Sequence, residues 1–164
     1  MTNWKVLSQN MAEILQLDSR IIAVKRLENR EGLAKIPGIE KPKSAFTYCQ
    51  LPFLVRKQGK TVGITKEDAA ALAEKMQLRY RCLRIQGLAP ADEEQIDHEA
   101  KGFAGFWFKD YETARKAVGG YPNPSPIDAL AMAPLDEEKF EPDFVLIYAN
   151  GGQMTLLMNG LQYE

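Results

Sequence analysis

The feature that most constrains the fold is the C-terminal stretch 141–161, which joins an apolar run to a glycine turn and a helical repeat. Pro142 precedes an uninterrupted apolar run over 144–149, and such a run is typical of a strand buried on both faces. The turn 150–152 contains two glycines, and apolar residues then recur at helical spacing over 153–161. This pattern predicts a central strand, a glycine turn and a helix in sequence.

Other segments have the apolar period of a helix, with three or four residues between apolar positions. Within one of them, Pro52 is expected to begin, bend or interrupt the helix. In another, Thr65 and Asp68 resemble a capping box. We expect helices over residues 3–17, 45–58, 65–76 and 110–118.

Three further segments have the composition of strands, being rich in β-branched, aromatic or alternating apolar residues. We expect strands at 21–27, 79–86 and 102–108, the last of them buried. Segments rich in proline or glycine are expected to be loops, and the acidic stretch 91–99 a solvated turn or short helix. Together these elements predict an α/β fold, with α+β as the alternative: a mixed sheet covered by several helices, in one domain spanning 1–164.

Composition restricts the partners and the compartment. With 21 basic and 22 acidic side chains, the net charge is −1, so no overall field attracts nucleic acid or an anionic membrane surface. The two cysteines form no CxxC motif. The N-terminal stretch is not a basic leader followed by an apolar run, and no stretch is long and apolar enough to span a membrane. We therefore expect a cytoplasmic protein with neither partner.

Several short motifs together resemble the uncharacterised family called domain of unknown function 169. These are AVKRL at 23–27, Cys49 followed by Gly59, TKEDA at 65–69, and EPDFVLIYANGGQM at 141–154. The resemblance covers roughly residues 20–163. It implies a bacterial or archaeal cytoplasmic protein, and it implies no particular reaction.

The chain departs from the family pattern in two respects. Family members have a second cysteine near the position of Ala70 or Ala71, where this chain has AAALA. A metal or cluster held by paired cysteines in relatives is therefore in doubt here. Relatives also continue past the position of Glu164, so we expect a C-terminally shortened family member.

The strongest candidate ligand site is the turn made by Asn150, Gly151, Gly152 and Gln153. Glycines between a strand and a helix let a ligand approach backbone amides at the positive end of the helix dipole. Asn150 and Gln153 could then orient the ligand. The simpler interpretation, and the favoured one, is a tight turn that needs the positive φ of glycine.

Cys49 is the main candidate for thiol, metal or redox chemistry, although a cysteine in an aromatic segment is more often a small apolar residue. Tyr48 or His98 could handle protons beside it. His98 lies in the acidic run DEEQIDHEA, which favours a solvated surface over a metal site. Cys82 has the pattern of a residue on an apolar strand face.

Two further groups have both a structural and a functional interpretation. Three arginines alternate along the predicted strand 79–86 and could bind a carboxylate or phosphate, but alternation also describes any half-exposed strand. Four aromatic residues close to 105 are expected to belong to the core, with a pocket wall for a planar ligand as the alternative. The groups are Arg79, Arg81 and Arg84, and Phe103, Phe106, Trp107 and Phe108.

The leading functional hypothesis is a protein that binds a small ligand or cofactor between the 150–153 turn and the Cys49 segment. The sequence indicates no particular cofactor. One alternative is a redox or thiol enzyme that uses Cys49. Another is an interaction module that pairs with a second copy of itself through exposed apolar surface.

Overall fold

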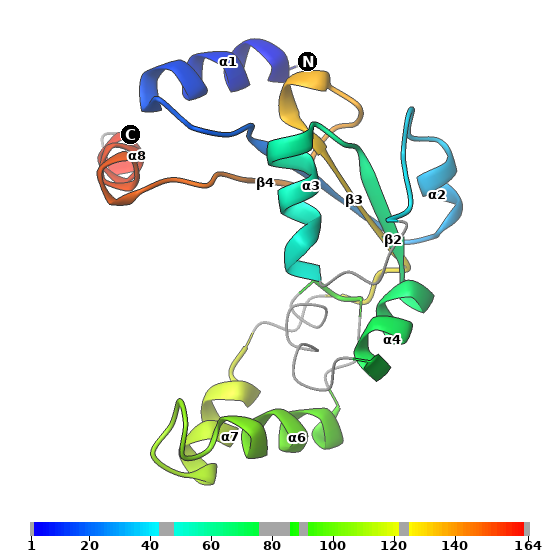
Figure 1. Ribbon diagram of the computed structural model, residues 1–164, viewed down its shortest axis with the longest axis vertical. Helices are drawn as coiled ribbons and strands as arrows, with labels where there is room; N and C mark the ends of the chain where they lie inside the picture. The colour runs from blue at the N-terminus through cyan, green and yellow to red at the C-terminus, as the bar shows by residue number, and fades with distance from the viewer. Residues whose placement is uncertain (1, 43–47, 76–85, 89–91, 122–124, 163–164) are drawn as a thin grey trace.

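The centre of the computed structural model is a four-stranded sheet (Figure 1). The strands lie in the order β2-β3-β1-β4, and every neighbouring pair is antiparallel. Outside the named strands, isolated parallel bridges join Glu40 to Val62 and Ala104 to Phe108. The strands are β1 (Ile22–Leu27), β2 (Val62–Thr65), β3 (Ala129–Pro134) and β4 (Phe144–Leu146).

The structure describes residues 2–42, 48–75, 86–88, 92–121 and 125–162. About this sheet lie helices from both halves of the chain, which confirms the α/β class. They are α1 (Trp4–Leu15), α2 (Glu31–Ala34), α3 (Leu51–Gln58), α4 (Lys66–Lys75), α6 (Glu93–Phe103), α7 (Tyr111–Gly119) and α8 (Gly151–Gln162), with short 3-10 helices η1 (Tyr48–Gln50) and η2 (Leu135–Glu137).

Side chains of β1 alternate between the two faces of the sheet, as the two-residue period of a strand requires. Ile22 and Val24 are fully buried in the larger core cluster, together with Leu51 and Val55 of α3. Helix α3 therefore covers this face of the sheet (Figure 1).

The opposite face is covered by α1 and the segment around η2. Ile21 and Ala23 are buried there with Leu135, and Trp4 and Met11 of α1 pack against them. The exposed end of this contact is held by polar groups, since the indole Nε1 of Trp4 donates to a carboxylate oxygen of Glu141 at 2.8 Å.

Local signals in the sequence account for the starts of α3 and α4. Pro52 lies in the first turn of α3, where its missing N–H is not needed, so it begins the helix rather than bending it. At α4 the predicted capping box forms: the amide of Asp68 donates to Oγ1 of Thr65 at 3.2 Å, and the amide of Thr65 donates to Oδ2 of Asp68 at 3.0 Å.

The prediction of a central strand at 144–149 is wrong. Only Phe144–Leu146 pairs, it lies at the edge of the sheet beside β1, and its three side chains are half-buried. The strand buried at all six positions is β3, with sequence ALAMAP. Its alanines have low strand propensity, and so it was not predicted; nor was the four-residue β2.

Asp143 fixes the start of the edge strand β4 against β1. Its carboxylate accepts from Nζ of Lys25 at 2.8 Å and from the amide of Arg26 at 2.6 Å. Its own amide donates to the carbonyl of Val24 at 2.9 Å. Partial burial raises the pKa of Asp143, but the bonds from Lys25 and Arg26 outweigh it, so the pKa lies below the ordinary value.

The helical predictions fare well where the structure describes them. Helices α1 and α4 lie within the predicted ranges 3–17 and 65–76, and α7 matches 110–118 except that it extends one residue further, to Gly119. In the acidic stretch 91–99 the helical interpretation is the correct one, since α6 begins at Glu93. The predicted strand 79–86, with Arg79, Arg81, Cys82 and Arg84, lies almost wholly outside the described residues. Among the described helices, none is long and apolar enough to cross a membrane.

Candidate functional site

Helices α6 and α7 form a hairpin that lies beyond one end of the sheet (Figure 1). Each helix begins at an aspartate whose side chain accepts a hydrogen bond from an amide of the first turn. Asp92 accepts from the amide of Gln95 at 2.8 Å, and Asp110 from the amide of Thr113 at 2.8 Å. These caps satisfy amides that a helix leaves without a partner in its first turn.

Charged and polar side chains tie the two helices together. The hydroxyl of Tyr111 on α7 donates to Asp97 on α6, and Arg115 pairs with Glu93. Asp97 also pairs with Lys101 at 2.6 Å. The bonds from Lys101 and Tyr111 lower the pKa of Asp97, while the bond to Asp97 raises the pKa of Tyr111.

The turn between the helices is closed by backbone hydrogen bonds. The carbonyl of Phe103 accepts from the amides of Trp107 at 2.9 Å and Phe108 at 3.2 Å. The amide of Gly105 donates to the carbonyl of Phe108 at 2.8 Å. Gly105 has a φ of 75°, a conformation that glycine adopts at little cost. The turn therefore has a defined shape that sets the directions of its aromatic side chains.

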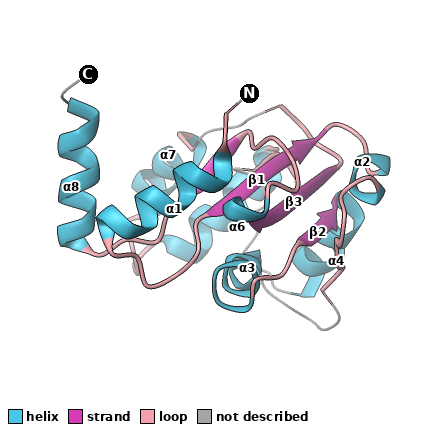
Figure 2. Ribbon diagram, turned by 90° about the horizontal axis from the view of Figure 1, so that it is seen from above, coloured by secondary structure: helices cyan, strands magenta, loops and turns pink. Residues whose placement is uncertain are grey.

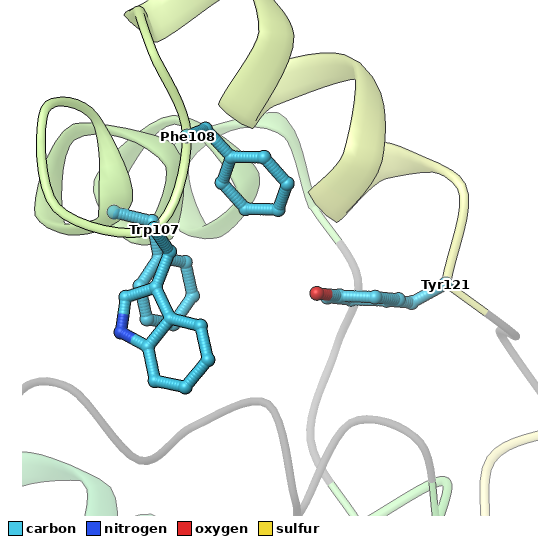
Figure 3. A pocket seen from close by; sticks show the side chains of 4 residues that line it. Trp107, Phe108 and Tyr121 are labelled. Atoms are coloured by element: carbon cyan, nitrogen blue, oxygen red, sulfur yellow. The ribbon is translucent and has the colours of Figure 1, made fainter.

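An aromatic pocket of about 220 Å³ lies beside this turn. Its described lining consists of Phe103 at the end of α6, Trp107 and Phe108 of the turn, and Tyr121 just after α7. Figure 3 shows the Tyr121 hydroxyl pointing across the space toward the rings of Trp107 and Phe108. Four aromatic side chains from three successive segments thus converge on one cavity.

The prediction of a buried strand at 102–108 is wrong. Residues 102 and 103 end α6, and the rest form the turn. Phe106 is 79% exposed and Trp107 71% exposed, in an edge-to-face contact with 5.9 Å between ring centroids. These aromatics are therefore not part of the sheet core, and the alternative of a pocket wall describes Phe103, Trp107 and Phe108.

The described lining of the pocket suits a small, flat molecule. No charged side chain is among its described lining residues. Aromatic faces stack on planar rings and exclude water from them. A cavity of roughly 150 Å³ holds benzene, whereas drug-sized ligands need roughly 300–1,000 Å³. A volume of about 220 Å³ therefore fits one ring or two fused rings.

We expect the contact between α6 and α7 to depend on pH at both extremes. Since the pKa of Asp97 is lowered, its contribution to stability is present at neutral pH and is lost as the pH falls below its ordinary value of 3.8. Since the pKa of Tyr111 is raised, its contribution is lost as the pH rises above 10.0. In a phenolate absorbance titration, Asp97→Asn should lower the pKa of the tyrosine that Tyr111→Phe removes. An unchanged titration in Asp97→Asn would contradict this coupling.

The turn predicted as the ligand site is a capping box of α8. The amide of Asn150 donates to Oε1 of Gln153 at 2.8 Å, and the amide of Gln153 donates to Oδ1 of Asn150 at 3.0 Å. Nε2 of Gln153 also donates to the carbonyl of Gln16 at 2.8 Å, next to α1. Gly151 and Gly152 begin α8, and neither has a positive φ. The polar groups proposed to orient a ligand thus have structural partners.

The structure places the other candidates in separate elements. Cys49 is exposed in η1, where Tyr48 also lies, beside the helix that covers the sheet. His98 is exposed on α6, in the hairpin. Among the described residues no group of three or more His, Cys, Asp or Glu side chains is arranged to hold a metal ion.

Tyr121 is the pocket residue that sequence reasoning missed. In the sequence it is the first residue of the proline-rich segment after Gly119 and Gly120, which predicts a loop. An aromatic residue at the end of the second helix of a hairpin, with aromatics in the turn between the helices, was the available signal. Using this signal required knowing that the helices 93–103 and 111–119 pack against each other.

Taken together, the fold and the pocket define an α/β protein with a four-stranded antiparallel sheet and a helical hairpin that presents an aromatic cavity. The chain belongs to the family domain of unknown function 169, described as "Uncharacterised ArCR", whose model matches residues 10–164. This confirms the resemblance noted in the sequence. Comparisons with curated proteins and with solved structures gave no match.

Proposed function

We propose that the protein binds a small, planar, uncharged molecule of one or two fused rings in the aromatic pocket. The observation that carries this proposal is the convergence of Phe103, Trp107, Phe108 and Tyr121 on one cavity of about 220 Å³. Rings at such a site gain both apolar burial and stacking. Binding requires no covalent step.

This proposal keeps the small-ligand hypothesis of the sequence but moves the ligand to another site. The capping box at Asn150 and Gln153 accounts for that turn without a ligand. The thiol-enzyme alternative rests on Cys49 and is less favoured, since His98 lies on another element. An exposed thiol fits a reducing compartment, and we propose the cytoplasm.

Isothermal titration calorimetry with indole and with 4-methylphenol tests the proposal. Trp107→Ala removes one wall of the pocket and is expected to weaken binding of these probes at least about tenfold, the equivalent of about 1.4 kcal/mol. Phe108→Ala should have a similar effect, because its ring faces the same space.

The chain supplies a matched control in Phe106, an adjacent aromatic residue that is not part of the described lining. Phe106→Ala should leave the affinity within about twofold, since its ring is 79% exposed and already solvated. Circular dichroism checks that each variant is folded. The absence of binding at millimolar probe, or an equal loss in Phe106→Ala and Trp107→Ala, would refute the proposal.

A further inference from the structure

Helix α8 has the composition of a buried helix, yet no residue of it is buried. Its sequence, GGQMTLLMNGLQ, contains no charged side chain in 12 residues. Met154 is 46% exposed, Met158 49% and Leu161 72%. Surface helices normally have a polar face toward solvent, so α8 is suited to a partner that its own chain does not provide among the described residues.

The apolar residues of α8 extend over more than one side of the helix. Met154, Leu157, Met158 and Leu161 follow the spacing i, i+3, i+4, i+7 and so form one seam. Leu156, which is 57% exposed, lies on the opposite side. Apolar residues on two sides of a helix indicate that two other elements pack against it.

Helix α1 has a second apolar surface beside α8. Its inner face packs on the sheet through Trp4 and Met11, while Leu7 and Ile14 on its flank are 39% and 73% exposed. The hydrogen bond from Gln153 to the carbonyl of Gln16 joins the start of α8 to the end of α1. From this junction the two helices diverge, leaving an angle between them (Figure 2).

We propose that the exposed apolar surfaces of α1 and α8 on either side of this angle form the contact surface of a homodimer. In this dimer α8 of each copy packs against α1 and α8 of the other. A second copy is the occupant that the surface fits best. Since α8 has no charge, it cannot select a partner by charge complementarity, and two copies of it do not repel each other. If a two-fold axis relates the two copies, α8 of each copy covers the apolar surface of the other. Both apolar surfaces of both copies are then buried.

The available apolar area matches what a dimer of this kind needs. A leucine, isoleucine or methionine side chain that is roughly half exposed can bury about 50–70 Å² on association. Six such residues in each of two copies then bury on the order of 600–800 Å². A standard interface of roughly 1,200–2,000 Å² is about 57% apolar, so its low end requires roughly 700 Å². The residues are Leu7, Ile14, Met154, Leu156, Met158 and Leu161.

Sedimentation velocity of the full chain over a range of concentrations tests the proposal. The wild type is expected to sediment with twice the chain mass of 18.5 kDa. Met158→Lys on α8 and Ile14→Glu on α1 each place an uncompensated charge in the contact. Each variant alone should raise the dissociation constant on the order of 100-fold or more.

Mixing the two variants distinguishes the exchanged arrangement from pairing of α8 helices alone. In a mixed dimer the lysine of one copy meets the glutamate of the other, and the second contact between α1 and α8 is wild type. We therefore expect an equimolar mixture of Met158→Lys and Ile14→Glu to dimerise although neither variant does alone. Loss of dimer in Met158→Lys without any loss in Ile14→Glu would overturn the exchanged arrangement.

A matched control lies on α1. Gln9→Glu adds the same charge as Ile14→Glu at an exposed position away from the apolar flank, and it should leave the dimer intact. All three positions are exposed, so we expect the variants to fold, which circular dichroism checks. A wild type that stays monomeric at every concentration, or a dimer that survives Met158→Lys, would overturn the proposal.

Discussion

Gly87→Ala is expected to lower the free energy of unfolding by about 2–5 kcal/mol. Gly87 has a φ of 84°, where an L-residue with a Cβ is less stable by roughly 1–2 kcal/mol. A Cβ added there would lie 2.6 Å from the backbone oxygen of Ser125. Because that atom belongs to the backbone, relief requires the chain itself to move, which costs about 1–3 kcal/mol more.

The position of Gly87 explains why such movement affects the whole fold. The carbonyl of Gly87 accepts from the amide of Ile127 at 3.0 Å, and the next residue, Leu88, is fully buried in the main core. The oxygen of Ser125 that the new methyl would meet also accepts from Nη2 of Arg26 at 2.6 Å. Several contacts between β1 and the segment before β3 would therefore shift together.

Denaturant unfolding followed by circular dichroism measures the effect. Gly119→Ala is the matched control, because Gly119 ends α7 with a φ outside the positive region and no atom within 4 Å of its added Cβ. Alanine favours a helix there by up to about 1 kcal/mol, so this variant should be as stable as the wild type or slightly more. A loss below about 1 kcal/mol in Gly87→Ala would show that the Gly87–Ser125 contact is not tight.

Ile22→Ala is expected to cost about 2–5 kcal/mol, because it opens a cavity in the centre of the sheet. Ile22 is fully buried on β1, opposite Pro134 of β3 and Leu146 of β4. Its side chain belongs to the cluster beneath α3. The surrounding strands are hydrogen-bonded on both sides of β1, so the site has little freedom to collapse around the missing atoms.

A graded series identifies the cavity as the cause. Ile22→Val removes one methylene group and should cost about 0.5–1.5 kcal/mol. Val6→Ala on α1 removes apolar atoms that are already 48% exposed, and it should change stability by no more than about 0.5 kcal/mol. Similar losses in Ile22→Val and Ile22→Ala, measured by denaturant unfolding, would argue against a cavity and for a change in the backbone of β1.

The candidate site shows how far sequence reasoning reaches on function. The aromatic residues at 103–108 were noticed, and the pocket wall was stated as the less favoured alternative to core. Choosing between them required the exposure of Phe106 and Trp107, which depends on neighbours that are distant along the chain. The glycines make the turn at Asn150 the strongest candidate ligand site in the sequence, although a plain tight turn is the favoured interpretation. An Asn and a Gln three residues apart are also the ends of a capping box, which is what the structure has.

The sequence by itself determined the local elements. Helices α1, α4 and α7 and strand β1 follow from apolar period, capping residues and β-branched side chains, all of which act within a few residues. Family membership likewise follows from short motifs and is confirmed over residues 10–164.

Only the tertiary structure decided which strand is central and which surfaces remain exposed. β1 pairs with β3 about one hundred residues later in the chain, and no local pattern encodes that distance. An apolar run such as 144–149 indicates that burial is favourable, but it does not specify the neighbour. The alanines of β3 are buried because two strands and two covering faces enclose them, whereas the apolar side chains of α8 are exposed because none of the described residues covers them.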